Sequence, residues 1–319
     1  MMRRPLLTAL CAICAACSPG DQEPPELTTT NTISFNSLAP AQLSDNGVAV
    51  NSLAAGPLAG AATDLVDTED GQKVLSYVVR CALPEGQSAV FTLDDGSTVS
   101  YDGVLGFAPA WAGAALDATG KRWMSACLLA HVNAFSIAVP ISVRAWPKGE
   151  PSLEESTSFE VQEAAFYGDI FADDPADRHM HACFGYHVAA LLGYDGDINE
   201  DSLDYLQYRV CATEEEQDVD CGFVRTGACF NWGPPIEGVA SQACDENSGN
   251  FYLDCHDRPI GEGETVTWLE TVTVHLLRAD FDRQMEEYLE AEGCTVDSPP
   301  CEGGPFCASA VTCNASDAN

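Results

Sequence analysis

The chain has 319 residues, with 49 acidic and 14 basic side chains and a formal net charge of −35 at pH 7. A protein this acidic repels polyanions such as nucleic acid, and it also repels an anionic lipid surface. Nucleic-acid binding is therefore excluded, and contact with a membrane has to come from a covalent anchor.

The first 16 residues have the pattern of an export signal. Arg3 and Arg4 form a positively charged start, and an apolar stretch of about a dozen residues follows, which is too short to span a bilayer. Two small residues then precede Cys17, as they precede the acylated cysteine of bacterial lipoproteins. We expect cleavage after Ala16 and a lipid on Cys17, which predicts a lipoprotein of the outer membrane or cell surface. Ordinary cleavage near Ala16, giving a soluble secreted chain, is the alternative.

The cysteine count also points to export. The chain has 15 cysteines, and cleavage removes Cys11 and Cys14. If Cys17 carries lipid, the twelve that remain are an even number, which suits a fully oxidised protein. Intracellular zinc proteins use paired CxxC spacings, which the mature chain lacks. The count therefore predicts disulfides and no zinc ribbon.

Residues 17–66 predict a flexible tether between the lipid and the folded part. They are rich in Ser, Thr, Asn, Ala, Pro and Gly, and they contain no Lys or Arg. Such a composition does not bury enough apolar surface to offset the entropy lost on ordering.

Residues 67–150 predict an α+β core domain. Asp67 or Thr68 can cap a helix that ends before Pro84, because acidic residues occupy the first turn and apolar residues recur at helical spacing. A strand over the same residues is the alternative. A β-hairpin is expected next, turning at the Asp-Gly pair of residues 95–96.

A second helix is expected over residues 123–133, and a strand over residues 137–146, where Pro140 implies a sheet edge or a bulge. Cys81 and Cys127 lie in the two predicted helices with no other cysteine near them. We therefore expect a Cys81–Cys127 disulfide, worth about 4 kcal/mol in the chain-entropy treatment.

Residues 151–290 predict an acidic, cysteine-rich β region, and residues 291–319 a cysteine-rich tail with two further bridges. Within them we expect a strand over 159–167, β-rich alternation over 265–277 and an amphipathic helix over 281–292. The expected fold class is α+β, with two helices packed on antiparallel strands, followed by a disulfide-rich and mainly β second half. The disulfide pairing of the six cysteines between 183 and 255 stays open.

Three segments carry a resemblance to known proteins. They read YVVRCALP at 77–84, LGFAPAW at 105–111 and WMSACLLA at 123–130, with Asn133 beyond. Together with an Asn-Ser/Gly-Leu-rich leader, they resemble an uncharacterised family of secreted, cysteine-rich myxobacterial lipoproteins. The resemblance spans about residues 35–171. It implies an exported, lipid-anchored architecture and no known activity.

One acidic loop has the alternating oxygen side chains that Ca²⁺ prefers. The candidate ligands are Asp195, Asp197, Asn199 and Asp201. Glu200 stands where an EF-hand needs glycine, and Leu206 stands where it needs a closing glutamate. A solvated acidic loop is the alternative, and calcium is the one cofactor that the sequence suggests.

His179 and His181 form an H-x-H pair that a strand places on one face, and His187 follows. Three histidines suit a catalytic zinc site with an open position, whereas surface histidines beside a disulfide at Cys183 are the alternative. No nucleophile elbow, P-loop or dinucleotide fingerprint is present. We expect a binding or structural module for a protein or glycan ligand, and a secreted metal-dependent hydrolase using His179 and His181 is the alternative.

Overall fold

The computed structural model describes residues 33–61, 63–135, 137–145, 159–172, 178–191, 204–211, 223–230, 242–247, 251–257, 266–291, 294–296 and 311–313. The expected export signal, Cys17 and the rest of the expected tether up to residue 32 lie outside these residues. Across the described segments, no helix combines the length and the apolar composition needed to cross a lipid bilayer.

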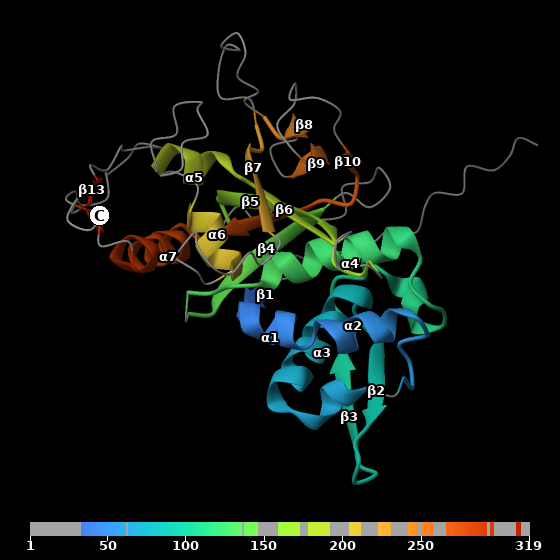
Figure 1. Ribbon diagram of the computed structural model, residues 1–319. Helices are drawn as coiled ribbons and strands as arrows, with labels where there is room; N and C mark the ends of the chain where they lie inside the picture. Colours follow the sequence, from blue (N-terminus) through green and yellow to red (C-terminus); the bar gives the residue numbers. More distant parts are fainter. Residues whose placement is uncertain are drawn as a thin grey trace, which may run out of the picture.

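Helices and strands alternate along the chain (Figure 1). The helices are α1 (Pro40–Asp45), α2 (Gly47–Ala54), α3 (Glu69–Ala82), α4 (Ala118–His131), α5 (Tyr186–Leu191), α6 (Asp204–Cys211) and α7 (Arg278–Ala291), with short 3-10 helices η1 (Asp64–Asp67) and η2 (Pro109–Ala112). The strands are β1 (Ile33–Asn36), β2 (Ser88–Thr92), β3 (Thr98–Asp102), β4 (Val139–Ala145), β5 (Val161–Asp169), β6 (His179–Phe184), β7 (Phe223–Ala228), β8 (Cys244–Asn247), β9 (Tyr252–His256), β10 (Thr267–Trp268), β11 (Val272–Leu276), β12 (Cys294–Val296) and β13 (Val311–Cys313). The α+β class expected from the sequence is confirmed, with disulfides in the later part of the chain.

A six-stranded sheet in the order β1-β4-β11-β5-β6-β7 forms the centre of the fold. Neighbouring strands are antiparallel except β6 and β7, which run parallel. Strand β11 comes late in the chain but lies between β4 and β5, where Val274 pairs with Val143 on one side and with Ala164 on the other. The boundary expected at residue 150 therefore does not separate two folded units, because the segments on both sides of it contribute strands to one sheet.

Local sequence signals account for the two long helices beside this sheet. The Thr68 hydroxyl accepts the Gly71 N–H at 2.9 Å and begins α3, so the helix expected there is confirmed and the strand alternative is wrong. The Asp117 carboxylate accepts the Gly120 N–H at 2.7 Å and begins α4 at Ala118, five residues before the predicted start. Helix α3 is amphipathic and buries one side in the core, whereas α4 is buried at every residue from Trp123 to His131.

A disulfide between Cys81 and Cys127 joins α3 to α4, as the isolation of these cysteines predicts. Their Cα atoms are 6.0 Å apart, within the usual range for disulfides, and both residues are fully buried. The link closes a sequence separation of 46 residues in the part of the fold where α3 packs against α4.

The tether expected at residues 17–66 is wrong from Ile33 onward. Strand β1 pairs with β4, and α1 and α2 follow it. Leu58 is fully buried and its N–H binds the Trp111 carbonyl at 2.8 Å, while the Trp111 indole N–H binds the Gly56 carbonyl at 3.0 Å. The apolar residues of this segment find partners in distant segments, which local composition does not reveal.

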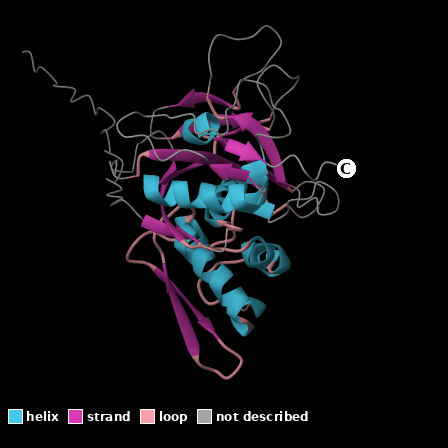
Figure 2. Ribbon diagram, turned by 90° about the vertical axis from the view of Figure 1, so that its left-hand side faces the viewer, coloured by secondary structure: helices cyan, strands magenta, loops and turns pink. Residues whose placement is uncertain are grey.

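The β-hairpin predicted near residue 95 is confirmed as β2 and β3, and it extends away from the rest of the fold (Figure 2). Gly96 has a φ of 82°, the conformation that favours glycine in such a turn. The edge position expected for Pro140 is wrong, because β1 lies outside β4 and pairs Phe35 with Pro140. Pro140 is tolerated because the β11 register ends at Ile141, so no ladder bond to β11 is lost.

The two faces of the six-stranded sheet have different coverings. Helix α4 packs on β5 and β11 on one face, with α3 behind it. The opposite face carries a three-stranded sheet in the order β10-β9-β8, called the small sheet below; Figure 1 shows it on the side of the central strands away from α4. Polar contacts tie this sheet down: the Tyr252 N–H binds the Thr273 hydroxyl at 2.9 Å, and the Tyr252 hydroxyl binds Gln162 at 2.7 Å.

The later part of the chain contains three helices beside its strands. The predicted strand at 159–167 is β5, and the predicted helix at 281–292 is α7. In the tail, β12 pairs with β13 and places Cys294 opposite Cys313, whereas Cys301 and Cys307 lie outside the described residues.

Candidate functional site

The predicted calcium ligands lie outside the part of the chain that the structure describes. They are Asp195, Asp197, Asn199 and Asp201. The predicted lipidation site, Cys17, lies outside it as well. The structure does describe His179, His181 and His187, so the predicted zinc site can be examined.

His179 and His181 lie on one face of β6, as expected, with ring centroids 5.8 Å apart and ring planes 14° from parallel. The predicted third zinc ligand, His187, lies near the other end of β5. His181 pairs with Tyr167 of that strand, whereas His187 Nδ1 accepts the N–H of Gln162 at 3.2 Å. The three-histidine zinc site is therefore wrong: the chain turns at the end of β6 and carries His187 along β5, away from the pair.

Three further side chains lie beside the histidine pair. We call the five residues together the histidine–tryptophan cluster: Tyr167, His179, His181, Trp268 and Arg122. The His181 ring lies 5.5 Å from the Tyr167 ring and 5.7 Å from the Trp268 ring, and the His179 ring lies 6.1 Å from Trp268. Arg122 Cζ lies 5.3 Å from the centre of the Trp268 ring. Strands β5, β6 and β10 and helix α4 thus meet at one place.

Glycine at position 168 permits the close approach of β5 and β6 where His179 lies. Its φ is 139°, and a Cβ atom at this position would collide with the His179 carbonyl. Gly168 has no functional side chain, but it allows the backbone position of His179 and so determines where the imidazole lies.

His181 is the most constrained member of the cluster. It is 4% exposed, and neither ring nitrogen has a hydrogen-bond partner among the described residues. Burial, together with the neighbouring His179, lowers its pKa to about 4, although Asp257 acts in the opposite direction. The Trp268 indole N–H is also buried and without a hydrogen-bond partner in the described segments, whereas His179 is exposed. The ring nitrogens of His181 and Trp268, which lack partners among the described residues, thus lie beside the exposed imidazole of His179.

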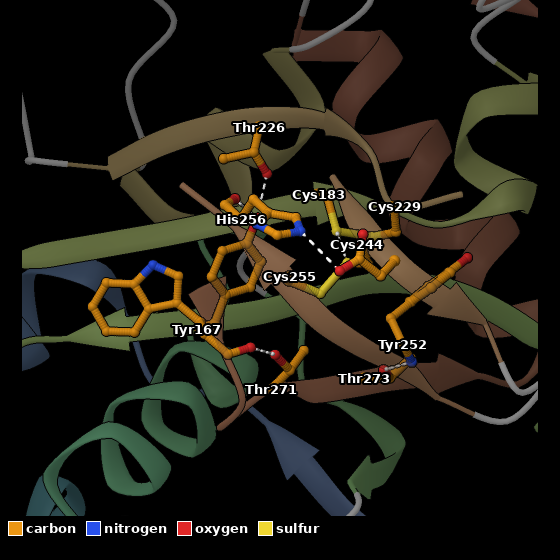
Figure 3. The surroundings of a disulfide bond; sticks show 12 residues. Tyr167, Cys183, Thr226, Cys229, Cys244, Tyr252, Cys255, His256, Thr271 and Thr273 are labelled. Carbon is orange, nitrogen blue, oxygen red and sulfur yellow. Dashed lines mark hydrogen bonds and ion pairs between the residues drawn. A yellow bond between two sulfur atoms is a disulfide. The ribbon is translucent and has the colours of Figure 1, made fainter. Parts of the chain in front are cut away.

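Tyr167 anchors the floor of the cluster rather than offering a reactive group. Its hydroxyl lies 2.5 Å from the Thr226 hydroxyl and donates to the His256 carbonyl at 2.8 Å (Figure 3). Burial raises the pKa of Tyr167 far above its usual value, so the phenol stays protonated. These bonds connect the central sheet to β9 and fix the ring against which His181 stacks.

Two disulfides lie beside this floor (Figure 3). Cys183 bonds to Cys229 and Cys244 bonds to Cys255, and the Cys183 and Cys244 sulfurs are 3.5 Å apart. The first joins β6 to the residue after β7 and the second joins β8 to β9, so the small sheet meets β6 here through the contact between the two disulfides. Because sulfur in a disulfide offers no thiolate, this group does not provide a metal site.

Among the described residues, the groups of three or more ligand-type side chains that converge all contain cystine sulfur. They are Cys81, Cys127 and His131, and Cys183, Cys244 and Cys255. Neither group fits a zinc centre, for the reason just given.

A second histidine has contacts that resemble a catalytic pair. His131 Nδ1 donates to the Cys127 carbonyl at 2.7 Å, so Nε2 accepts from the Ser34 hydroxyl, also at 2.7 Å. Both residues are fully buried, and burial lowers the pKa of His131 to about 4 with help from Arg80. No substrate reaches this serine. The pair instead fastens β1 to α4.

A buried ion pair lies on the helix-covered side of the sheet. The register between β5 and β11 shifts at Glu163, a β-bulge that re-aims this side chain. Its carboxylate lies 2.8 Å from Arg209 Nε and accepts the Tyr205 hydroxyl at 2.6 Å. Arg209 also donates to the Ala130 carbonyl at 3.1 Å. The group joins α6, α4 and β5, and all of its side chains are enclosed.

Sequence reasoning identified the histidine pair but missed its surroundings. Tyr167, Trp268 and Arg122 are separated by tens of residues and share no motif, so no local spacing signals that they meet. Comparisons with protein-family models, with curated proteins and with solved structures found no match for this chain.

Proposed function

We propose that this protein is an exported lipoprotein of the cell envelope that acts as a binding module. In this proposal Cys17 carries the lipid, the disulfide-linked body is displayed beyond the membrane, and the histidine–tryptophan cluster is its recognition site. The export pattern, the even cysteine number and the resemblance to myxobacterial lipoproteins support the first two parts.

The observation that carries the recognition site is the state of His181. A buried polar group without a partner costs about 1–3 kcal/mol, so such groups are uncommon unless a ligand or function retains them. Here His181 and Trp268, whose ring nitrogens have no hydrogen-bond partner among the described residues, lie together beside the exposed His179. Binding of a ligand that offers hydrogen-bond or coordination partners would remove this cost.

The hydrolase alternative is less well supported by the geometry. A catalytic zinc site needs three protein ligands and an open position, held by supporting residues. His187 is bound to the Gln162 backbone far along β5, so the described residues supply two imidazoles and no third ligand. We therefore favour binding over turnover.

The anchor is tested by expressing the wild type and Cys17→Ser in a bacterial host that acylates lipoproteins. We expect a diacylglyceryl cysteine at the mature N-terminus and recovery of the wild type in the membrane fraction, with both lost in the variant. An unmodified N-terminus at another residue would contradict the anchor.

The recognition site is tested without knowing the ligand, by carbethoxylation of histidines followed by peptide mass spectrometry. We expect His179 to react in the purified protein and to be protected when the protein is in isolated native envelopes, with half-buried His187 as the internal reference. Equal reactivity of His179 in both preparations would refute the assignment of this surface.

A further inference from the structure

We propose that His179 and His181 together bind one divalent transition-metal ion, of the class of Cu²⁺ or Zn²⁺. The inference rests on the proposed role of the histidine–tryptophan cluster as a binding site, and it names the ligand of that site.

The geometry of the pair carries the inference. The two imidazoles project from the same face of one strand, and their rings lie nearly parallel with centroids 5.8 Å apart. For both imidazoles to bind one ion at the ~2.0–2.1 Å typical of metal–imidazole bonds, the side chains have to rotate until a nitrogen of each ring points at the ion. Gly168 holds that backbone, and Tyr167 and Trp268 hold the His181 ring from two sides.

The donor atoms of His181 are not engaged by other described residues. Both nitrogens of His181 lack a hydrogen-bond partner within the described segments, so coordination does not have to break an existing bond. Other histidines differ in this respect: both ring nitrogens of His131 are bonded, and His187 Nδ1 accepts a backbone N–H. The pair is therefore distinguished by its chemistry as well as by its spacing.

The surrounding charge favours a cation. Asp257 is close enough to His181 to favour a positive charge on the ring, and the same carboxylate would favour a bound metal ion. The nearby guanidinium of Arg122 acts against it, but it lies over Trp268 and pairs with Glu270 at 3.7 Å. The chain as a whole carries a net charge of −35, which raises the local concentration of cations.

The ligand type selects the metal class. Neutral imidazole suits copper, zinc and nickel, whereas Ca²⁺ and Mg²⁺ prefer oxygen ligands. Two protein ligands leave coordination positions open, and these positions would accept donor atoms of a partner, which agrees with a binding module rather than a hydrolase. A chain with 49 acidic residues also binds cations loosely through carboxylates, so the experiment has to separate the two modes.

The test uses the full oxidised mature chain, purified without a polyhistidine tag and without chelators. Calorimetric titration with CuCl₂ and with ZnCl₂ is expected to give one tight site, while MgCl₂ gives none. His179→Gln and His181→Phe are each expected to weaken that site about tenfold or more, since loss of even a supporting residue typically costs 10–100-fold in metal affinity. His181→Phe keeps an aromatic ring between Tyr167 and Trp268, so the fold is retained, and His187→Gln is the matched control that should bind like the wild type.

Electron paramagnetic resonance of the Cu²⁺ complex supplies a second readout, with couplings expected from two imidazole nitrogens. Unchanged affinity in both variants, an effect in only one of them, or fewer than two coupled nitrogens would each overturn the inference. The two proposals fail separately: if His179 is protected in envelopes but the purified protein has no tight copper or zinc site, the recognition surface stands and its ligand is not a metal ion.

Discussion

The two faces of the central sheet are stabilised by different kinds of contact. On the helix-covered face, α4 and α3 bury apolar side chains, and the polar groups there are fully enclosed, as in the Glu163–Arg209 pair. On the face covered by the small sheet, hydroxyl and amide bonds and two neighbouring disulfides add to the apolar packing. The first face therefore depends more on enclosure and the second more on specific pairings. On the second face, His181 and the Trp268 indole N–H have no hydrogen-bond partner among the described residues.

The largest expected effect is on the helix-covered face. Arg209→Met leaves the Glu163 carboxylate buried beside Tyr205 without its cation, so we expect the free energy of unfolding to fall by about 3–5 kcal/mol. Chemical denaturation monitored by circular dichroism measures the change.

The matched control for that substitution is Arg283→Met, which removes the partner of Asp280 in a surface pair and should cost about 0–1 kcal/mol. If both variants lost a similar free energy of unfolding, the enclosed ion pair would be no more important for stability than a surface pair.

Removing one disulfide near each face allows their contributions to stability to be compared. Cys81–Cys127 and Cys183–Cys229 both span 46 residues, so the chain-entropy treatment predicts the same loss, about 4 kcal/mol, on removing either pair with alanines. Denaturation midpoints of the two double variants test this equality. A larger loss on removing Cys183–Cys229 would show that native packing of the small sheet depends on this disulfide beside Cys244–Cys255, and a smaller loss would reverse the contrast between the faces.

His131 should make stability depend on pH from the helix-covered face. Its folded-state pKa is lowered to about 4, so between pH 6.5 and 4 the unfolded chain binds the proton more readily than the folded chain. Stability should therefore fall as the pH drops through this window, by on the order of 3 kcal/mol from this residue. The free energy of unfolding, measured at pH 7 and at pH 4.5, tests this. The difference between the two values should be smaller in His131→Gln than in the wild type, and an equal difference would show that His131 does not cause the pH dependence.

The smallest expected effect concerns the polar face. Tyr167→Phe deletes a hydroxyl that contacts Thr226 and the His256 carbonyl, and it leaves those groups unsatisfied, at a cost of about 1–3 kcal/mol. Tyr101→Phe is the control, because the Tyr101 hydroxyl has no hydrogen-bond partner in the described part of the chain. Thermal unfolding should separate the two variants, and equal melting temperatures would argue that this face does not depend on specific pairings.

The sequence predicts the parts of this protein that short-range chemistry specifies. Thr68 caps α3, the Asp-Gly turn with Gly96 joins β2 to β3, and the isolation of Cys81 and Cys127 indicates their pairing. Each of these rests on signals within a few residues or on elimination among cysteines. The H-x-H spacing likewise places His179 and His181 on one strand face.

Tertiary structure alone decided the rest, because those features depend on strand pairing between residues far apart in the chain. Ile33 begins a sheet strand only because Ser142 is available to pair with it, and β11 enters the sheet only where β4 and β5 leave room. Trp268 reaches His181 from β10, which pairs with β9 in the small sheet. The sequence shows which residues prefer to be buried or hydrogen-bonded. It does not show which distant residues will contact them, because that depends on the whole fold.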